Sequence, residues 1–260
     1  MTSRVALVTG AARGIGAATV RRLAADGWAV MAVDSCGGPD AVPYPLPSAD
    51  DLDALVGGLP DAGSAVADVR DRQALDTVVA DVLERWGRLD AVVAAAGVVA
   101  GGRPLWDTAE TDVGLMWDVN ARGVWNVAAA SIPAMLAGPD PSGCRFVAVA
   151  SAAGHHGLFH LAAYTASKHA TVGIVRGLAA DLVGTGIAAI AVSPGSTRTA
   201  MLEQTAELFP DADVADMVRH QLLQRVLEPD ELAATIVFCC SAAGAALNGS
   251  VVHADGGFRG

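Results

Sequence analysis

The segment TGAARGIG, from Thr9 to Gly16, stands between an apolar run and a stretch that can form a helix from Ala17 onward. Glycines at such a strand-to-helix turn let the backbone approach a pyrophosphate, and they aim the N–H groups of the helix N-terminus at it. The glycines follow a GxxxGxG spacing, which differs from the common GxGxxG fingerprint: Gly10, Gly14 and Gly16. On its own the segment therefore predicts either a phosphate-binding turn or simply a tight turn.

Apolar runs and helical segments alternate along the whole chain. Five short apolar runs are typical of buried parallel strands: Val5–Val8, Ala29–Val33, Ala91–Ala95, Arg145–Ala150 and Ile187–Val192. Segments between them carry apolar residues at helical spacing: Ala17–Ala25, Arg72–Trp86 and Ala163–Leu182. This alternation predicts an α/β three-layer Rossmann fold, a doubly wound parallel sheet with helices on both faces. We expect residues 1–260 to form a single dinucleotide-binding domain.

Composition and charge exclude several classes of function. The 260 residues carry a formal net charge of -11 and no cluster of Lys or Arg, so we expect no nucleic-acid partner and no membrane partner. No window offers the roughly 18–20 uncharged apolar residues that a membrane span needs. The first apolar run begins too early for a signal peptide, and the four cysteines show no CxxC spacing, so we expect a cytoplasmic protein.

Two acidic residues follow apolar runs and indicate which dinucleotide binds. Asp34 closes the second run, where a carboxylate can hydrogen-bond an adenosine ribose and repel a 2′-phosphate, so the sequence favours NAD over NADP. Arg13 is the counter-argument, because it can either reach a phosphate or pack along the helix start and face solvent. Asp68 with Val69, after the run Ser64–Ala67, is predicted either to approach the adenine amino group or to cap a helix.

A candidate reacting centre lies in the segment AYTASKHA. Tyr164 and Lys168 are four residues apart, hence on one face of a helix. A phenol is a poor base at neutral pH, but a nearby ammonium and the positive charge of an oxidised nicotinamide favour its phenolate form. Ser151 follows a predicted strand, and its hydroxyl can hydrogen-bond a substrate oxygen that becomes a carbonyl. Alone, the YxxxK spacing is also typical of ordinary surface helices.

Together with Asn120 in DVNARG, these motifs resemble the short-chain dehydrogenase/reductase family over nearly the whole chain. The resemblance implies a catalytic tetrad of Asn120, Ser151, Tyr164 and Lys168, in which Asn120 holds a water that relays protons to Lys168. The run SPGSTRT is similar to the PG motif of the family and should border the nicotinamide carboxamide. The segment HADGG is similar to one that usually supports a homotetramer.

The resemblance also implies the full set of cofactor contacts. The expected NAD-binding residues are Gly10, Arg13, Gly14, Ile15, Gly16, Asp34, Asp68, Val69, Ala96, Gly97, Tyr164, Lys168, Pro194, Gly195, Thr197 and Thr199. One departure is plain, because the NNAG motif of the family is AAAG at residues 94–97 here. We expect the missing amides to loosen either the sheet or the adenosine contact.

Two segments interrupt the alternation and are expected to cover the ligand crevice. Residues 35–47, the part of VDSCGGPDAVPYPLP (residues 33–47) beyond Asp34, contain prolines that predict an extended flap. Residues 196–225 are predicted to form a substrate lid. The flap, with a short helix around Ser48–Val56, resembles the mycofactocin-associated, carveol dehydrogenase-like branch of the family. That resemblance implies a buried NAD that does not exchange and passes electrons to mycofactocin; a harmless surface loop is the alternative.

Other features leave alternatives open. His155, His156 and His160 have no helix to hold them, because Gly154 and Gly157 interrupt the segment, and they lack a metal-binding spacing, so we expect no metal and place them at the substrate pocket. An apolar pocket is expected from Leu158, Phe159, Trp106 and Met201, and it suits a hydrophobic secondary alcohol or its ketone. The alternatives are an ordinary reductase of the family with exchangeable NAD(P)H, and a non-catalytic dinucleotide-binding relative.

Overall fold

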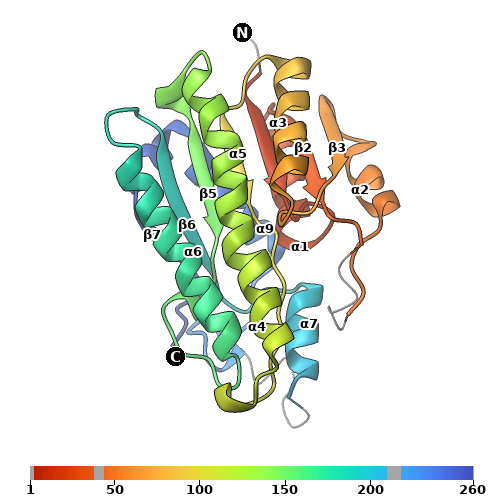
Figure 1. The fold of residues 1–260 in the computed structure, drawn as a ribbon, viewed down its shortest axis with the longest axis vertical. Coiled ribbons are helices and arrows are strands. Elements are labelled where there is room, and N and C mark those ends of the chain that lie inside the picture. Colours follow the sequence, from red (N-terminus) through yellow and green to blue (C-terminus); the bar gives the residue numbers. More distant parts are fainter. Residues whose placement is uncertain (1–2, 38–43, 210–217, 260) are drawn as a thin grey trace.

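The computed structural model describes residues 3–37, 44–209 and 218–259, and a parallel sheet runs through them (Figure 1). The strands lie in the order β3-β2-β1-β4-β5-β6-β7, and each pairs with its neighbours in parallel. Their bounds are Val5–Thr9 (β1), Ala29–Asp34 (β2), Ala62–Val66 (β3), Ala91–Ala94 (β4), Arg145–Val149 (β5), Ala188–Pro194 (β6) and Val251–Ala254 (β7). The predicted doubly wound sheet is confirmed.

Helices cover both faces of the sheet, because alternate strand residues point to opposite sides. In β1, Val5 and Leu7 pack into one apolar cluster, whereas Ala6 and Val8 pack into a second. Three helices cover the first cluster: α3 (Arg72–Trp86), α5 (Gly123–Ala137) and α6 (Ala162–Asp181) (Figure 1). Two helices cover the second: α1 (Gly14–Ala25) and α9 (Pro229–Cys240).

The shorter helices and turns lie in the connections between the strands, at both ends of the sheet and at its edges. They are α2 (Ala49–Val56), α4 (Glu110–Met116), a π-helical turn (Trp117–Arg122), α7 (Ala200–Glu207) and the 3-10 turns Leu105–Asp107, Pro141–Gly143, Ala152–Gly154 and Ala242–Leu247. The predicted helix near Ser48–Val56 is confirmed as α2. Ser48 is its N-cap, and its hydroxyl accepts a hydrogen bond from the Asp51 N–H at 3.2 Å.

The sequence did not predict β7, and the bounds of several strands differ from the expected ones by one or two residues. β7 is an edge strand that pairs with β6 alone, and its residues are only partly buried or exposed. An edge strand needs no continuous apolar run, because solvent reaches it on one side. The central strands, buried along their whole length, produced the runs that were recognised.

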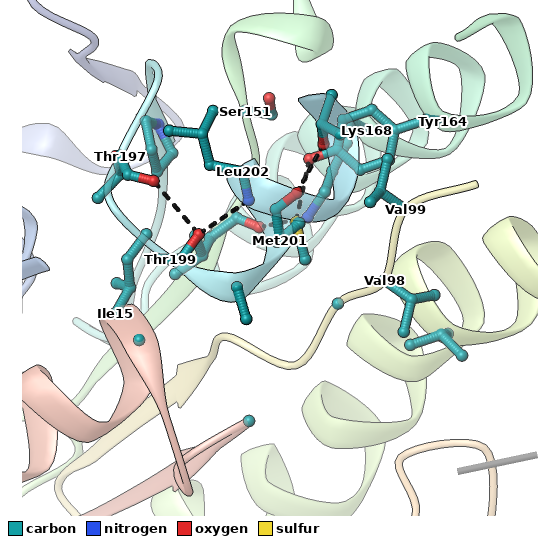
Figure 2. Close-up of a pocket in the computed structure, with 18 of the residues that line it drawn as sticks. Ile15, Val98, Val99, Ser151, Tyr164, Lys168, Thr197, Thr199, Met201 and Leu202 are labelled. Carbon is teal, nitrogen blue, oxygen red and sulfur yellow. Dashed lines mark hydrogen bonds between the residues drawn. The ribbon is translucent and has the colours of Figure 1, made fainter. Parts of the chain in front are cut away.

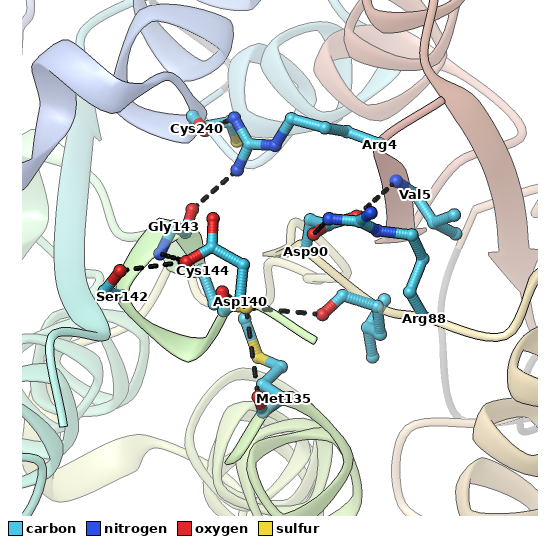
Figure 3. A network of polar contacts seen from close by, with 11 residues as sticks. Arg4, Val5, Arg88, Asp90, Met135, Asp140, Ser142, Gly143, Cys144 and Cys240 are labelled. Carbon is cyan, nitrogen blue, oxygen red and sulfur yellow. Dashed lines mark hydrogen bonds and ion pairs between the residues drawn. The ribbon is translucent and has the colours of Figure 1, made fainter. Parts of the chain in front are cut away.

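A polar network joins the amino ends of the central strands, at the end of the sheet opposite to the crevice (Figure 3). Asp90 precedes β4 and is 2% exposed; its carboxylate accepts a hydrogen bond from the Val5 N–H at 2.8 Å and pairs with Arg88 at 2.6 Å. Arg145 begins β5 and is also buried, and its guanidinium donates to surrounding backbone carbonyls, including that of Ser142 at 2.9 Å. The network therefore fixes where the central strands begin.

We expect Asp90→Ala to lower the free energy of unfolding by about 3 kcal/mol, because it leaves a buried N–H unsatisfied and removes a charged partner of the largely buried Arg88 guanidinium. The matched control is Asp76→Ala, which breaks the exposed pair between Arg72 and Asp76 on α3 and should cost about 0.5 kcal/mol or less. Urea denaturation followed by circular dichroism measures both. Equal losses in the two variants would contradict the structural role of Asp90.

Candidate active site

A cavity of about 970 Å³ opens at the carboxyl ends of the strands. Segments that follow β1, β2, β3, β4, β5 and β6 line it, together with parts of α6 and α7. This position is the crevice where the strand order reverses between β1 and β4, and ligands bind there in open α/β sheets. Of the predicted site residues, all except Asn120 line this cavity.

The glycine turn brings the backbone of two segments into close contact. Gly10 has a φ of +65°, and a Cβ placed on it would lie 2.6 Å from the Cα of Ala96, so a side chain cannot be accommodated. α1 begins directly afterwards at Gly14, and the extended Arg13 before it provides no side-chain cap. The first N–H groups of α1 are therefore left for another partner, and the turn fits a pyrophosphate.

We expected the AAAG segment to loosen either the sheet or the adenosine contact, but the sheet is regularly paired at this segment. Ala94 pairs with Thr9 of β1 on one side and with Ala148 of β5 on the other. The N–H of Ala96 also reaches the Thr9 hydroxyl, at 3.4 Å. Backbone pairing needs no side-chain amide, and the small alanine lets the glycine turn approach.

Asp34 lies at the end of β2 and faces the cavity with a fixed carboxylate. One of its oxygens accepts a hydrogen bond from the Ala12 N–H at 3.0 Å, and the other from the Cys36 N–H at 3.4 Å. Each carboxylate oxygen can accept more than one hydrogen bond, so capacity remains for two ribose hydroxyls. The arrangement fits the predicted adenosine ribose.

Arg13 does not simply face solvent, which was one of the two alternatives. Its guanidinium donates a hydrogen bond to the carbonyl oxygen of Pro45 at 2.8 Å and lies 5.8 Å from the centre of the Tyr44 ring. Tyr44 is 8% exposed, and its hydroxyl accepts a hydrogen bond from the Val99 N–H at 3.1 Å. We call the two hydrogen bonds, from Arg13 to the Pro45 carbonyl and from the Val99 N–H to the Tyr44 hydroxyl, the Arg13–Tyr44 latch. It anchors residues 44–47 of the proline-rich segment; residues 38–43 of the predicted flap lie outside the described residues.

Asp68 follows β3 and lines the cavity, but it does not cap a helix. Its carboxylate forms a bidentate pair with the Arg70 guanidinium, with distances of 2.6 and 3.0 Å. Burial alone would raise the pKa of Asp68, but the hydrogen bonds and charge of Arg70 outweigh burial and lower that pKa. The helix cap is Asp71, which accepts hydrogen bonds from the first N–H groups of α3. The capping alternative is therefore wrong.

Tyr164 and Lys168 lie one turn apart on α6, and both side chains are buried beneath the cavity. The Lys168 Nζ lies 5.8 Å from the centre of the Tyr164 ring and donates a hydrogen bond to the Val149 carbonyl at the end of β5, at 3.0 Å. Burial lowers the pKa of Lys168 to about 8. Burial raises the pKa of Tyr164 to about 12, while a hydrogen bond with Ser151 acts in the opposite direction.

Asn120 lies in the π-helical turn and is fully buried, away from the cavity lining. Its side chain accepts a hydrogen bond from the Val98 N–H at 2.9 Å and donates to the Ser167 hydroxyl at 3.1 Å. Its backbone carbonyl accepts from the Thr171 hydroxyl at 2.9 Å. Asn120 thus ties the segment after β4 to α6. Its role in a water relay stays a prediction.

The PG motif ends β6, and Thr197 and Thr199 continue from it to the start of α7, within the predicted lid (Figure 2). Thr199 caps α7 by accepting a hydrogen bond from the Leu202 N–H at 3.3 Å, and a Cβ placed on Gly14 would lie 3.2 Å from its methyl group. The start of α7 therefore packs on the glycine turn. Residues 210–217 of the predicted lid lie outside the described residues.

The walls of the substrate end of the cavity are apolar, as predicted, but the residues that form them are not all those that the sequence predicted. Leu158, Phe159 and Met201 line the cavity. Trp106 does not: it is 81% exposed and belongs to a 3-10 turn beyond the cavity, so its assignment to the pocket is wrong. Sequence reasoning did not single out two wall residues, Leu161 and Leu208, whereas Phe209 belongs to the segment predicted to cover the crevice.

Two further features concern metals and membranes. Among the described residues, no group of three or more His, Cys, Asp or Glu side chains is arranged to hold a metal ion. His160 lines the cavity, whereas His155 and His156 pack beside it against His253 and Phe258. In the same described ranges, no helix has the length and apolar character needed to cross a bilayer.

Two polar side chains and one latch residue escaped the sequence analysis. Ser167 and Thr171 hold Asn120, and Tyr44 holds the proline-rich segment. Lys168, which the sequence analysis did predict, carries a further signal, because it is the only lysine among the 260 residues. A chain that otherwise uses arginine keeps this lysine at a position where the amine must be buried.

The single lysine makes its ionisation directly measurable. We expect the side-chain signal in a lysine-labelled NMR sample to titrate with a midpoint near pH 8, because burial disfavours the ammonium form. The folded-state pKa lies below the unfolded one, so the charge destabilises the fold below pH 8, and this penalty fades as pH rises towards 10.5. Lys168→Met should therefore raise the free energy of unfolding at pH 7 by about 2 kcal/mol and remove that pH dependence. A midpoint near 10.5 would contradict the burial argument.

Comparison with known proteins agrees with this geometry. A family model described as enoyl-(acyl carrier protein) reductase matches residues 10–259. A (-)-trans-carveol dehydrogenase of Rhodococcus erythropolis is 31% identical, with 98% of this chain and 96% of that protein covered. An uncharacterized NAD-dependent oxidoreductase of Mycobacterium tuberculosis is 35% identical, with 98% and 95% covered.

A solved structure extends the likeness to three dimensions. The carveol dehydrogenase of Mycobacterium avium, crystallised in complex with NAD, superposes with a TM-score of 0.92 at 31% identity, covering 99% of this chain and 98% of that one. The match spans the sheet, the glycine turn and the segment that carries Tyr164 and Lys168. The chain belongs to the short-chain dehydrogenase/reductase family of oxidoreductases.

Proposed function

We propose that the protein is an NAD-dependent oxidoreductase that interconverts a hydrophobic secondary alcohol and its ketone. The observation that carries the proposal is one cavity that holds Ser151, Tyr164 and Lys168 at an apolar end and Asp34 with the glycine turn at the other. A phenol, a hydroxyl and an amine gathered at one point suit proton transfer to and from an alcohol oxygen. A non-catalytic relative would not need that set.

The residues present fit NAD. The uncapped start of α1 can accept the pyrophosphate, and the carboxylate of Asp34 can hold the ribose hydroxyls and repel a 2′-phosphate. Arg13 would have to leave the Pro45 carbonyl to reach such a phosphate. When bound, NAD supplies a hydride acceptor, which no side chain of the protein can replace.

The reaction assigns one task to each catalytic side chain. In the oxidation direction Tyr164, as phenolate, takes the hydroxyl proton of the alcohol while the carbinol hydride leaves, and a C=O bond forms at that carbon. Ser151 donates a hydrogen bond to the same oxygen as it becomes a carbonyl. The protonated amine of Lys168 lies close enough to Tyr164 to favour the phenolate form of its side chain. Reduction of the ketone is the reverse.

The apolar end of the cavity supports a hydrophobic substrate. Leu158, Phe159 and Leu161 approach from the segment after β5, and Met201, Leu208 and Phe209 approach from α7 and its end. Such walls favour a ring or hydrocarbon skeleton and leave the reacting oxygen to Tyr164 and Ser151. Relatives named carveol dehydrogenase and 3beta-hydroxysteroid dehydrogenase act on alcohols of this kind.

We further propose that NAD stays bound between turnovers and that mycofactocin accepts the electrons. The support is the Arg13–Tyr44 latch, which holds the proline-rich segment beside Asp34 and the glycine turn. A homotetramer is also part of the proposal. Exposed apolar side chains along α4, the π-helical turn and α5 support such an assembly: Val113, Trp117 and Trp125.

Replacing the proposed base tests the reaction. Tyr164→Phe should lower turnover of trans-carveol by about 1,000-fold, because general-base catalysis typically contributes factors of 10² to 10⁴. The assay contains saturating NAD and a dichlorophenolindophenol acceptor, so that it reads both exchangeable and retained cofactor. His169→Ala, an exposed change on the same helix, is the control and should keep the rate. Near-normal turnover by Tyr164→Phe would overturn the proposed mechanism.

Removing the latch tests cofactor retention. After extensive dialysis the unsubstituted protein should hold stoichiometric NAD(H), measured by absorbance and mass spectrometry, while Arg13→Ala combined with Tyr44→Phe should lose it. Two lost hydrogen bonds predict dissociation about tenfold faster or more. The control is Arg21→Ala, which removes an exposed arginine from α1. Absence of NAD from the unsubstituted protein would favour the ordinary, exchangeable reductase instead.

A further inference from the structure

Helix α7 places one side chain directly over the proposed base. Met201 is its second residue, and the sulfur of Met201 lies 4.0 Å from the Tyr164 hydroxyl (Figure 2). The first turn of α7 is fixed by the Thr199 cap and by the contact of Thr199 with Gly14. The position of Met201 above Tyr164 therefore follows from the helix start and not from a freely moving loop.

The methyl of Met201 also lies near Gly97, which borders Lys168. A Cβ placed on Gly97 would lie 3.9 Å from the terminal methyl of Met201 and 3.4 Å from the Lys168 Nζ. The methyl therefore lies near the backbone that separates it from the amine. Met201 is partly buried and packs against the main apolar cluster, while its sulfur faces the cavity. It covers the point where the hydroxyl of Tyr164 opens to the substrate end.

We propose that Met201 is a specificity-determining residue, whose side chain closes the reaction chamber over Tyr164, contacts the carbon skeleton of the alcohol and limits its size. This inference rests on the proposed function and names how that site selects its substrate. An unbranched thioether adapts to different apolar shapes and makes favourable contacts with aromatic rings. A substrate whose oxygen approaches Tyr164 meets the side chain of Met201, which then packs on the carbons next to the reacting centre.

A second apolar contact lies just beyond the other end of α7. The rings of Phe209, which follows α7, and Phe159 lie 6.4 Å apart, and Phe159 stacks on His160. The inner contact lies at the reacting atoms and the outer one at the cavity mouth. Substitution at residue 201 should therefore change the fit of the reacting ring itself, whereas Phe209 affects entry.

The cover also excludes water from Tyr164, which gives a second, independent readout. The groups that face Tyr164 are Lys168 from its own helix, Ser151 from the segment after β5 and Tyr44 from the proline-rich segment. Burial is the largest cause of the raised pKa of Tyr164. If Met201 provides part of that burial, shortening its side chain admits water and lowers the pKa.

The first experiment compares Met201→Ala, Met201→Leu and the exposed control Glu203→Ala on the same helix. Three secondary alcohols of increasing size serve as probes: cyclohexanol, trans-carveol and a 3β-hydroxysteroid. Met201→Ala should raise KM for cyclohexanol and shift the kcat/KM ratio of the steroid to cyclohexanol by about tenfold, the scale of a changed apolar contact. Met201→Leu, which restores the bulk, and Glu203→Ala should leave the ratio within about twofold of the unsubstituted protein.

The second experiment needs no turnover. Tyr44 and Tyr164 are the only tyrosines of the chain, so a Tyr44→Phe background leaves Tyr164 as the single source of tyrosinate absorbance. In this background Met201→Ala should lower the titration midpoint of Tyr164 by about one pH unit, a part of the several units that full burial can add. Met201→Leu and Glu203→Ala should not shift it.

The two experiments separate the failure of each proposal. If the unsubstituted protein oxidises none of the three alcohols, the proposed function is overturned, and the specificity role of Met201 falls with it. If the unsubstituted protein oxidises them but Met201→Ala matches Glu203→Ala in both the size ratio and the titration, the role of Met201 alone is overturned. A changed ratio with a lowered titration midpoint supports both.

Discussion

The burial of Lys168 is the constraint around which the rest of the site is arranged. An amine taken out of water must find a hydrogen-bond acceptor, and the Val149 carbonyl provides one where β5 ends. That bond requires α6 to cross the end of β5 at a fixed height, and this in turn sets Tyr164 one turn earlier, beside Ser151. Burying the charged amine of Lys168 costs folding free energy. The polar network at the amino ends of the strands and the two apolar clusters offset this cost.

Most of the fold was predictable because burial leaves a mark in the sequence. Central strands such as β1 and β6 are covered on both faces, and they appear as continuous apolar runs. β7 lies at an edge and left no such run. The site was predictable where a side-chain type is required by chemistry, as for Tyr164. It was not predictable for Ser167, Thr171 and Tyr44, whose polar contacts depend on which segments the fold brings together.

The sequence predicted correctly where Arg13 could lie, but it did not predict the hydrogen-bond partner of its side chain. From the sequence it was either a phosphate contact or a solvent-facing residue. The structure places it at the cavity edge, but its guanidinium is engaged by the Pro45 carbonyl, 32 residues away along the chain. A contact of this separation has no local signature. It also explains how a segment rich in proline, which cannot donate backbone hydrogen bonds, is held by a donor from elsewhere.

The start of α7 links the two ends of the cavity. Thr199 packs on Gly14 of the dinucleotide turn, and two residues later Met201 covers Tyr164. Any displacement of α7 that admits a substrate must therefore also disturb the contact at the glycine turn, since eight residues of helix move largely as one body. α7 therefore contacts both the glycine turn, through Thr199, and the proposed base, through Met201. The proposed retention of NAD between turnovers would require α7 to keep its contact with Gly14 while alcohols and ketones exchange at the other end of the cavity.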